Sequence, residues 1–457
     1  MTLSQALCVF ERQPQLLVLH SGGAIRARDC RYTFLSADPI ATVRLNSVQY
    51  GDDPFDVLRQ WQMRLPNLRF SRVPPFCGGI AGLLSYELGH AFERLPEAAR
   101  DPLGVPRMLA GLYDWSLVWD HVDGTVRLFV LSIPGEDDPD GSRRRTARIE
   151  WVQTMLSSTT DEAAQLPASP TSRANAVRLP EIRSDFTREA YVTAIRQVIE
   201  YIRAGDIFQA NLSQQLQAPW EGTGTELFRR ACLQNPAPFA GLLQADDFSV
   251  ISASPERFLK VDQGRYVEAR PIKGTRRRQQ SPIADLFTAD ELSASEKDRA
   301  ENVMIVDLLR NDLSRSCRPG SVRVTGVCEI EVFETVQHLV STVVGELRAD
   351  RDVWDLLQGA FPGGSITGAP KIRAMQIITE LETTTRGAYC GSLFYCGPRG
   401  DFDSSILIRT FTLRNGLLHF PVGGGIVADS NAEEEYAETM HKASGMLKAL
   451  RGNAAAS

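Results

Sequence analysis

The segment Arg270-Pro271-Ile272-Lys273-Gly274-Thr275 places a single lysine between a strand-like run and a glycine. The residues before it, Tyr266 to Ala269, are typical of a short strand, and the proline is compatible only with the end or edge of that strand. Gly274 permits a turn that is closed to residues with a Cβ. We therefore expect Lys273 at a fixed corner of the chain. Taken alone, the segment is also compatible with a solvated basic loop, because arginines follow at 276–278.

The composition indicates a globular protein that acts on a small molecule. The chain has 457 residues, of which 43% are hydrophobic. This is enough for about two to three average domains, or for one large domain with an intimate partner. The net charge of -6 argues against a surface for nucleic acid or for an anionic membrane. Residues 1–18 lack the features of a signal peptide, and no apolar run approaches the ~20 residues that span a bilayer. We expect a cytoplasmic protein.

The distribution of cysteine and histidine limits the kinds of metal site. The eight cysteines are scattered without a CxxC pair, and the six histidines are dispersed. This pattern gives no indication of a zinc site and favours reduced, mostly buried thiols. A metal in this protein would need carboxylate ligands, which favours a hard ion such as magnesium.

The hydrophobic pattern divides the chain into four segments. The first is a β-rich N-terminal unit, in which short apolar runs alternate with turn residues. The second is rich in Gly, Pro, Ser and Thr, and we interpret it as a linker with one helix near 144–156. The third opens with a helix that Thr187 can cap, and the fourth is a C-terminal tail. The segments span residues 1–133, 134–185, 186–450 and 451–457.

Two expected helices carry carboxylates on faces that also carry apolar residues. The pattern over 298–313 predicts a helix that turns Glu301 toward the interior. In the C-terminal helix, Glu435, Glu438 and Lys442 stand at i, i+3 and i+7 and form one stripe. Buried charges are costly unless they are paired or coordinate a metal. The pattern is compatible with a hard-cation site between the two helices, and equally with an exposed face on which Glu438 and Lys442 form an ion pair.

Two glycine-rich turns offer backbone amides to an anion. The turn 361–371 ends in a proline suited to the first turn of a helix, so free amides there can face an anion. It is not a phosphate loop, because two residues separate its last glycine from Lys371 and no serine or threonine follows. The run 420–429 is a strand with three glycines that let a ligand approach the backbone. After it, Ser430-Asn431-Ala432-Glu433 matches a capping box that starts the C-terminal helix.

Several blocks of the sequence together resemble the family of chorismate-utilising enzymes. The similarity covers roughly residues 186–450 in order, and the N-terminal unit with Leu16 to Ser21 is similar as well. The blocks are Ser254 to Phe258, Pro271 to Thr275, Glu301 with 306–308 and 310–313, His338 to Ser341, Gly363 to Lys371, Gly424 to Ser430, and Glu435 to Lys442. On this agreement the chain is identified as a member of the family.

The resemblance implies an α+β fold in which two β-sheet subdomains pack face to face with helices on the outside. It also implies a Mg²⁺ cofactor that anchors the ring carboxylate of chorismate. The implied metal residues are Glu301 and Glu438, with Glu435 and Asp298 nearby. The implied catalytic residues are Lys273, Glu256 as general acid, and His338 close to the substrate. The implied substrate contacts are Gln209, Gly274, Thr275, Ser365, Tyr389, Arg409, Gly424, Gly425 and Lys442.

Two positions indicate a branch within the family. Isochorismate and salicylate synthases carry a lysine where this chain has Gln209, and anthranilate synthases carry an alanine where it has Lys273. A lysine at the latter position is typical of the large subunits of aminodeoxychorismate synthases. There the lysine adds to C2 of chorismate while the C4 hydroxyl leaves, and ammonia then enters at C4. The resemblance thus implies 4-amino-4-deoxychorismate as the product, on the way to p-aminobenzoate and folate.

The resemblance also implies partners. The sequence shows no recognisable glutaminase domain, so we expect the ammonia from a separate glutamine amidotransferase subunit or from free ammonium. A tryptophan pocket is implied about Ser21, although His20 replaces a glutamate of the feedback-regulated members. The alternatives are anthranilate synthase component I, a chorismate-binding regulatory protein without catalysis, and a nucleotide-binding protein. The joint presence of Glu256, Lys273, Glu301 and Glu438 argues against a decayed site.

Overall fold

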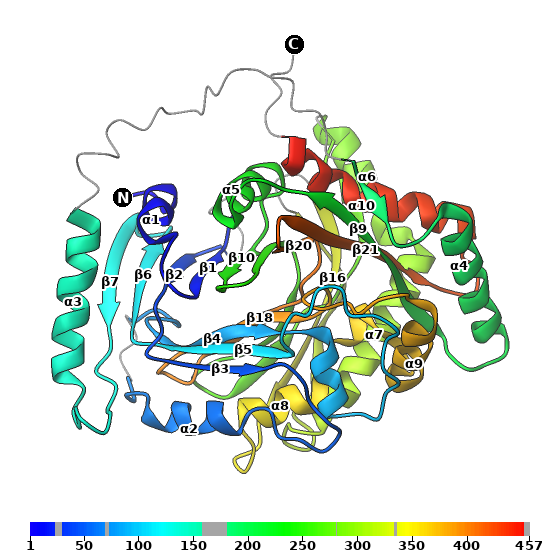
Figure 1. The fold of residues 1–457 in the computed structure, drawn as a ribbon. Coiled ribbons are helices and arrows are strands. Elements are labelled where there is room, and N and C mark those ends of the chain that lie inside the picture. The colour runs from blue at the N-terminus through cyan, green and yellow to red at the C-terminus, as the bar shows by residue number, and fades with distance from the viewer. Residues whose placement is uncertain (23–29, 69–72, 158–180, 280, 333–335, 452–457) are drawn as a thin grey trace.

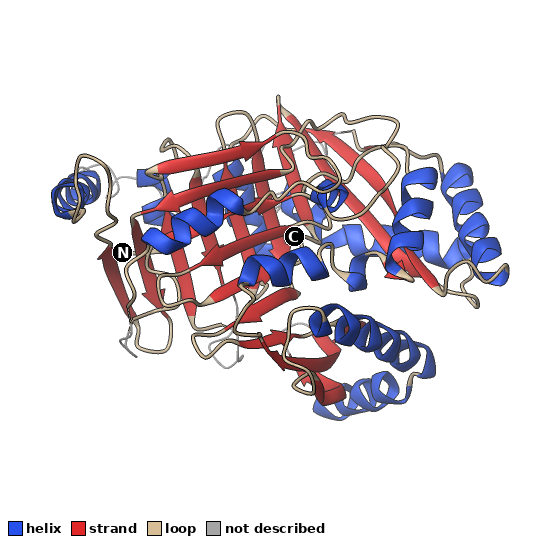
Figure 2. Cartoon of the chain, turned by 90° about the horizontal axis from the view of Figure 1, so that it is seen from below, coloured by secondary structure: helices blue, strands red, loops and turns tan. Residues whose placement is uncertain are grey.

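The computed structural model describes residues 1–22, 30–68, 73–157, 181–279, 281–332 and 336–451. Two antiparallel β-sheets pack against each other, and helices lie on their outer sides (Figure 1). Figure 2 views the molecule from below and shows helices lying across the strands. This arrangement confirms the α+β fold class that the resemblance implied.

The two sheets combine short strands from the whole length of the chain. The larger sheet runs in the order β17 (Gly368–Ala369), β9 (Gln209–Pro219), β21 (Leu417–Ile426), β20 (Thr410–Arg414), β11 (Ser249–Ser254), β10 (Phe239–Gln244), β1 (Leu16–His20), β2 (Tyr32–Ser36), β6 (Trp115–Asp120) and β7 (Thr125–Val130), with β8 (Arg183–Ser184) paired to β9. The second sheet runs in the order β14 (Ile272–Arg277), β16 (Val336–Glu346), β13 (Tyr266–Ala269), β12 (Arg257–Val261), β19 (Phe402–Ser405), β18 (Ser392–Cys396), β4 (Gly79–Leu84), β5 (Met108–Tyr113) and β3 (Ala41–Leu45), with β15 (Arg323–Val332) paired to β16.

A buried apolar layer holds the two sheets face to face. Leu17 and Leu243 of the larger sheet and Leu83 and Leu109 of the second sheet belong to one buried cluster. Alternate side chains of each strand point into this layer, because the side-chain period of a strand is two. Each fully buried leucine contributes roughly 1.5–3 kcal/mol of transfer free energy, so the layer fixes the sheets relative to each other.

Amphipathic helices cover the outer faces of the sheets. The larger sheet is covered by α1 (Leu3–Phe10), α3 (Ser142–Ser157), α5 (Gly224–Gln234) and α10 (Ala432–Arg451), with α4 (Arg188–Arg203) and α9 (Lys371–Leu381) beside β9. The second sheet is covered by α2 (Asp56–Arg64), α6 (Pro282–Ala294), α7 (Glu296–Ser314) and α8 (Val353–Ala360). In the described part of the chain, the 3-10 helix η1 (Tyr86–Ala91) follows β4, and the 3-10 helix η3 (Gly364–Ile366) lies between α8 and β17. Among the described helices, none combines the length and the apolar character that crossing a bilayer would require.

The strands of residues 1–133 do not form a sheet of their own. β1, β2, β6 and β7 lie in the larger sheet, whereas β3, β4 and β5 lie in the second. Leu17 of β1 pairs with Leu243 of β10, and Leu83 of β4 pairs with Leu393 of β18. The N-terminal segment therefore completes both sheets of the later segment, and the domain boundaries stay a prediction. The predicted linker helix is present as α3, while 158–180 lie outside the described residues.

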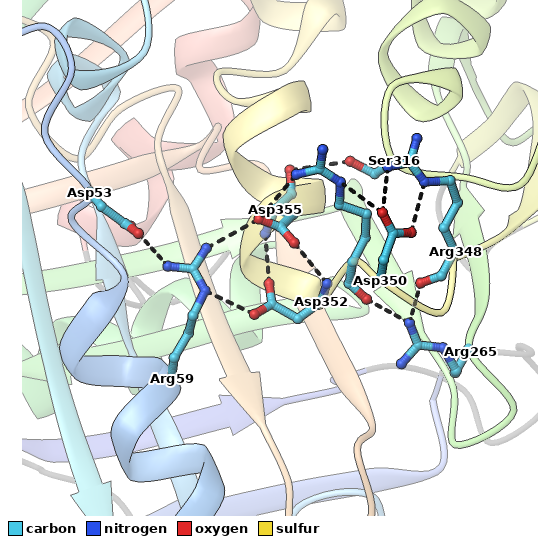
Figure 3. A network of polar contacts seen from close by, with 9 residues as sticks. Asp53, Arg59, Arg265, Ser316, Arg348, Asp350, Asp352 and Asp355 are labelled. Atoms are coloured by element: carbon cyan, nitrogen blue, oxygen red, sulfur yellow. Dashed lines mark hydrogen bonds and ion pairs between the residues drawn. The ribbon is translucent and has the colours of Figure 1, made fainter.

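A polar network anchors the outer helices of the second sheet (Figure 3). Asp352 and Asp355 form a capping box at the start of α8. Arg59 of α2 donates to Asp352 at 2.8 Å and to Asp355 at 3.3 Å, so one guanidinium ties α2 to α8. Arg265, in the turn between β12 and β13, donates at 2.6 Å to the carbonyl oxygen of Arg348. The network lies on the outside of the second sheet, where it fixes α2 to α8 and the turn between β12 and β13 to the segment before α8.

Candidate active site

Lys273 lies at a bulge within a strand. β14 pairs with β16, and the register shifts between Lys273, which pairs with Leu339, and Thr275, which pairs with His338. Gly274 has φ +76°, which residues with a Cβ rarely adopt. A Cβ on Gly274 would also lie 2.9 Å from Cγ of Asp298 in α7. The predicted fixed corner is thus a β-bulge, a device that re-aims a side chain, and Gly274 contacts α7 closely.

The amine of Lys273 is enclosed. Its side chain is 13% exposed, and Nζ lies 3.9 Å from Oε2 of Glu301. Nζ also donates to the carbonyl oxygen of Ser365 at 3.4 Å. Burial lowers the pKa of Lys273, against the opposing effect of Glu301 and Glu256. The solvated-loop interpretation is therefore wrong for this lysine, and burial favours its neutral, nucleophilic form.

Glu256 lies opposite the lysine, between β11 and β12. Its Oε1 accepts a hydrogen bond from Oγ of Ser365 at 2.8 Å. Burial raises the pKa of Glu256 to about 7, while the Ser365 hydroxyl and Lys273 act in the opposite direction. A carboxyl group with this pKa is partly protonated at neutral pH and can serve as a general acid. Ser365 thus contacts the amine through its carbonyl oxygen and the acid through its hydroxyl.

His338 and Arg409 are a neutral imidazole and a buried guanidinium whose charge acts on that imidazole. Nδ1 of His338 and Oγ1 of Thr275 lie 2.8 Å apart. Burial, and then the charge of Arg409, lower the pKa of His338 to about 4, so the imidazole is neutral at neutral pH. Burial also lowers the pKa of Arg409. Within the described part of the chain, no carboxylate pairs with the buried Arg409 guanidinium, so it can bind an anionic ligand.

The larger sheet contributes a buried amide and a glycine-lined strand. Gln209 at the start of β9 is fully buried, and among the described residues neither Oε1 nor Nε2 has a hydrogen-bond partner. A Cβ on Gly425 would lie 2.2 Å from Nε2 of Gln209. A Cβ on Gly424 would lie 3.4 Å from a carboxylate oxygen of Glu435 and 3.6 Å from Nζ of Lys442. The glycines therefore let β21 approach the site closely. The side-chain amide of Gln209, which has no hydrogen-bond partner from the described residues, can bind a ligand.

The predicted carboxylates come from two helices. Glu435 on α10 is buried and accepts from Oγ of Ser430 at 2.6 Å and from Nζ of Lys297 at 3.3 Å. Glu438 is 52% exposed and pairs with Lys442 at 2.8 Å, which is the ion pair considered above as the alternative. Burial raises the pKa of Glu301. No three acidic, histidine or cysteine side chains of the described residues lie close enough together to hold a metal ion.

Other predicted contacts occupy nearby positions. Tyr389 is buried, and its ring lies 5.9 Å from the guanidinium carbon of Arg386. Asp298 pairs with Arg276 at 3.3 Å, so one of the arginines after Lys273 neutralises a predicted metal-site carboxylate. Lys371 pairs with Asp312 at 2.6 Å and lies outside the site.

The predicted capping box of the C-terminal helix is displaced by one residue. Helix α10 begins at Ala432, and Oδ1 of Asn431 accepts from the backbone of Glu433 and Glu434. Asn431 is therefore the N-cap, because the hydroxyl of Ser430 is engaged by Glu435. The correction leaves the stripe of Glu435, Glu438 and Lys442 on one helix.

Two residues near the site were missed. Asn211 donates from Nδ2 to the carbonyl oxygen of Ser365 at 3.2 Å, on the same face of β9 as Gln209. Lys297 lies beside Glu435. The strand period of two from Gln209 points to Asn211, whereas the position of Lys297 depends on how α7 and α10 meet.

Ser21 lies in a separate pocket. A cavity of about 400 Å³ between the sheets is lined by residues that include His20, Ser21, Tyr32 and Tyr395. Burial, and then His121, lower the pKa of His20 to about 4, so its imidazole is neutral. The place of Ser21 in a pocket is compatible with a small ligand, and tryptophan stays a prediction.

Comparisons with known proteins agree with this geometry. The family described as chorismate binding enzyme matches residues 20–448. Aminodeoxychorismate synthase component 1 of Salmonella typhimurium is 42% identical over 96% of this chain and 93% of its own length. The protein of the same name from Escherichia coli is 40% identical over 96% of this chain and 93% of its own length.

Anthranilate synthases are similar too. Anthranilate synthase component 1 of Thermus thermophilus is 40% identical over 92% of this chain and 87% of its own length. The crystal structure of anthranilate synthase component I from Streptococcus pneumoniae aligns with a TM-score of 0.77 at 31% identity, covering 93% of this chain and 94% of that one. The resemblance deduced from the sequence is confirmed: this chain belongs to the chorismate binding enzyme family.

Proposed function

We propose that the chain is the large subunit of an aminodeoxychorismate synthase, which aminates chorismate at C4 to give 4-amino-4-deoxychorismate for p-aminobenzoate and folate synthesis. The observation that carries the proposal is the buried amine of Lys273, joined through Ser365 to the buried acid Glu256. Relatives of 40–42% identity that bear this name support it. Their designation as component 1 supports a second subunit, which we propose is a glutamine amidotransferase that supplies ammonia.

The proposed reaction uses the two buried groups in turn. The neutral amine of Lys273 forms a bond to C2, the bond from C4 to its hydroxyl oxygen breaks, and Glu256 gives its proton to that oxygen, so water leaves. Ammonia then bonds to C4, and the lysine leaves C2 as a neutral amine. The proton released from the added ammonia returns to Glu256. Chorismate and ammonia are thereby converted into the amino product and water.

The substrate is a dianion, and the site offers matching donors. Arg409, which has no ion pair among the described residues, is proposed to bind one carboxylate together with Tyr389. The backbone amides about Gly424 and Gly425, with Lys442, are proposed to contact the other. The unpaired amide of Gln209 is proposed to complete these contacts, and His338 with Thr275 to line the pocket.

We propose a Mg²⁺ site between α7 and α10, with Glu301 and Glu438 as ligands and Glu435 and Asp298 beside them. The residues fit a cation that keeps several waters and needs only one or two protein carboxylates. When bound, Mg²⁺ would supply the positive charge that anchors the ring carboxylate. Lys297 pairs with Glu435 and Arg276 pairs with Asp298, whereas Glu301 has only a longer contact of 3.9 Å with Lys273 and the exposed Glu438 pairs with Lys442 of its own helix.

The metal proposal predicts the behaviour of Glu438→Gln. We expect turnover to fall about 10- to 100-fold and the Mg²⁺ concentration for half-maximal rate to rise, because metal ligation is lost. Steady-state rates over a Mg²⁺ titration measure both. Glu434→Gln, an exposed glutamate on the same helix, is the control. An unchanged Mg²⁺ response of Glu438→Gln would refute the assignment.

The product distinguishes the candidate functions. With chorismate, Mg²⁺ and ammonium, we expect mass analysis to show 4-amino-4-deoxychorismate, and p-aminobenzoate only after an aminodeoxychorismate lyase is added. A fluorescent aromatic amine formed without the lyase would instead identify an anthranilate synthase. Stabilisation by chorismate without turnover would indicate a regulatory binding protein.

A further inference from the structure

A buried ion pair lies directly behind the proposed site. Arg386, beyond the C-terminal end of α9, has a side chain that is 3% exposed. Its Nε donates to Oε2 of Glu382 at 2.9 Å and its Nη2 to Oε1 at 2.6 Å, so the pair is bidentate. The guanidinium lies over the ring of Tyr86 at 4.7 Å. Two buried, hydrogen-bonded partners of this kind hold their neighbours in one geometry.

The remaining donors of Arg386 reach two segments that carry site residues. Nη1 donates to the carbonyl oxygen of Ile366 at 3.0 Å, in the turn η3 that also contains Ser365. Nη2 donates to the carbonyl oxygen of Asn211 at 2.6 Å, on β9 two residues after Gln209. One guanidinium therefore fastens η3 to the strand beside it.

Glu382 strengthens the same junction. Its Oε1 accepts from both the backbone amide and the hydroxyl of Ser213, each at 2.8 Å, on β9. Asn211 links β9 to this region directly as well: its backbone amide donates to the carbonyl oxygen of Thr367 at 2.8 Å, and its Nδ2 donates to the carbonyl oxygen of Ser365 at 3.2 Å. With Arg386 removed, the turn would keep links to β9 but lose the donor at Ile366.

Ser365 makes this junction relevant to the chemistry. Its carbonyl oxygen accepts from Lys273 and its hydroxyl donates to Glu256, and it is the residue next to Ile366. We infer that Arg386 is a positioning residue. It holds η3 against β9, so that Ser365 keeps the amine of Lys273 and the carboxyl group of Glu256 at their positions relative to each other. This inference rests on the proposed function for the roles of Lys273 and Glu256.

The test compares Arg386→Lys with wild type in the full chain. Lysine keeps a positive charge but cannot make the bidentate pair and both carbonyl contacts at once. We expect kcat with chorismate, Mg²⁺ and ammonium to fall about 10- to 100-fold, since small displacements of reacting groups are this costly. We expect KM for chorismate to change less than about threefold, because most of the proposed carboxylate contacts, those of Arg409, Lys442 and β21, are not made by groups that Arg386 contacts.

Arg148→Lys is the matched control. Arg148 on α3 is 10% exposed, pairs with Asp38 at 2.8 Å and Asp114 at 3.0 Å, and donates to a backbone carbonyl oxygen. It resembles Arg386 in burial and partners but lies away from the site. We expect a similar loss of melting temperature in both variants and a fall in kcat only in Arg386→Lys. Glu382→Gln, which keeps the shape of the pair, is the second variant if Arg386→Lys does not fold, and it should lower kcat in the same direction.

A readout independent of turnover separates this inference from the proposed function. Hydrogen exchange of the peptide spanning 361–370 should be faster in Arg386→Lys than in wild type and unchanged in Arg148→Lys. If wild type makes no amino product while this exchange difference appears, the proposed function fails and the positioning of η3 stands. The inference would be overturned if hydrogen exchange of this peptide in Arg386→Lys were the same as in wild type, or if the kcat of Arg386→Lys equalled that of wild type. An equal fall of kcat in Arg148→Lys would overturn it as well.

Discussion

Lys273→Ala is expected to lower formation of 4-amino-4-deoxychorismate by a factor on the order of 10³ or more, as removal of a covalent nucleophile does in other enzymes. In the proposed mechanism the amine adds to C2, and the described groups next to it offer no second amine: Glu256 and Glu301 are carboxylates, and Ser365 presents its carbonyl oxygen. With alanine there, ammonia can reach C2 itself, so traces of anthranilate are the expected side product. Product mass and rate, measured with chorismate, Mg²⁺ and ammonium, check both expectations.

The control for this variant is Lys448→Ala, which removes an exposed lysine from α10. It should leave the rate within about twofold of wild type, because surface substitutions rarely disturb a distant site. Chorismate should still stabilise Lys273→Ala against heat, since Arg409 and the β21 amides remain. Formation of the amino product at the wild-type rate by Lys273→Ala would eliminate the nucleophile from the mechanism.

Local features of the fold could be predicted from the sequence. The apolar run ending at His20 is β1, and the helix after Thr187 begins where predicted, with the Thr187 hydroxyl accepting from the amide of Ala190 at 3.2 Å. Such features depend on residues within one or two turns of each other. The start of α10 was predicted one residue too early. Ser430 and Asn431 are both good N-caps, and the hydrogen bond from Ser430 to Glu435 decides between them.

The pairing of the strands could not be predicted from the sequence. The residues of β1 show that a strand forms and which face it buries, but not that Leu17 pairs with Leu243. An alternating strand fits any sheet edge with a matching pattern. This is why residues 1–133 appeared to be a separate unit, although their strands complete both sheets.

In the site, too, some features could be predicted from the sequence and others could not. Lys273, Glu256 and Glu301 were expected from the family resemblance, and the structure brings the lysine within 3.9 Å of Glu301 and links it to Glu256 through Ser365. What the sequence did not show is the cause of the altered acidity. Burial is the principal cause of the lowered pKa of Lys273. Burial depends on all the elements that pack around a residue.

Glu256→Gln should lower kcat about 10²- to 10⁴-fold, the range expected for loss of a general acid. Glutamine keeps the size of the side chain and can still accept from the Ser365 hydroxyl, so binding should persist. It has no proton to give to the departing hydroxyl. Steady-state kinetics at neutral pH, with circular dichroism to verify folding, measures this effect.

The pH profile makes this second prediction specific. Because burial raises the pKa of Glu256 to about 7, the acid is protonated below that pH and loses its proton above it. The kcat/KM of wild type should therefore fall as pH rises through about 7, and this limb should be absent from Glu256→Gln. In Ser365→Ala the hydroxyl that lowers this pKa is missing, so the limb should move to higher pH. A limb that survives unchanged in Glu256→Gln would assign the proton to another group, and one that moves to lower pH in Ser365→Ala would contradict the hydrogen bond between them.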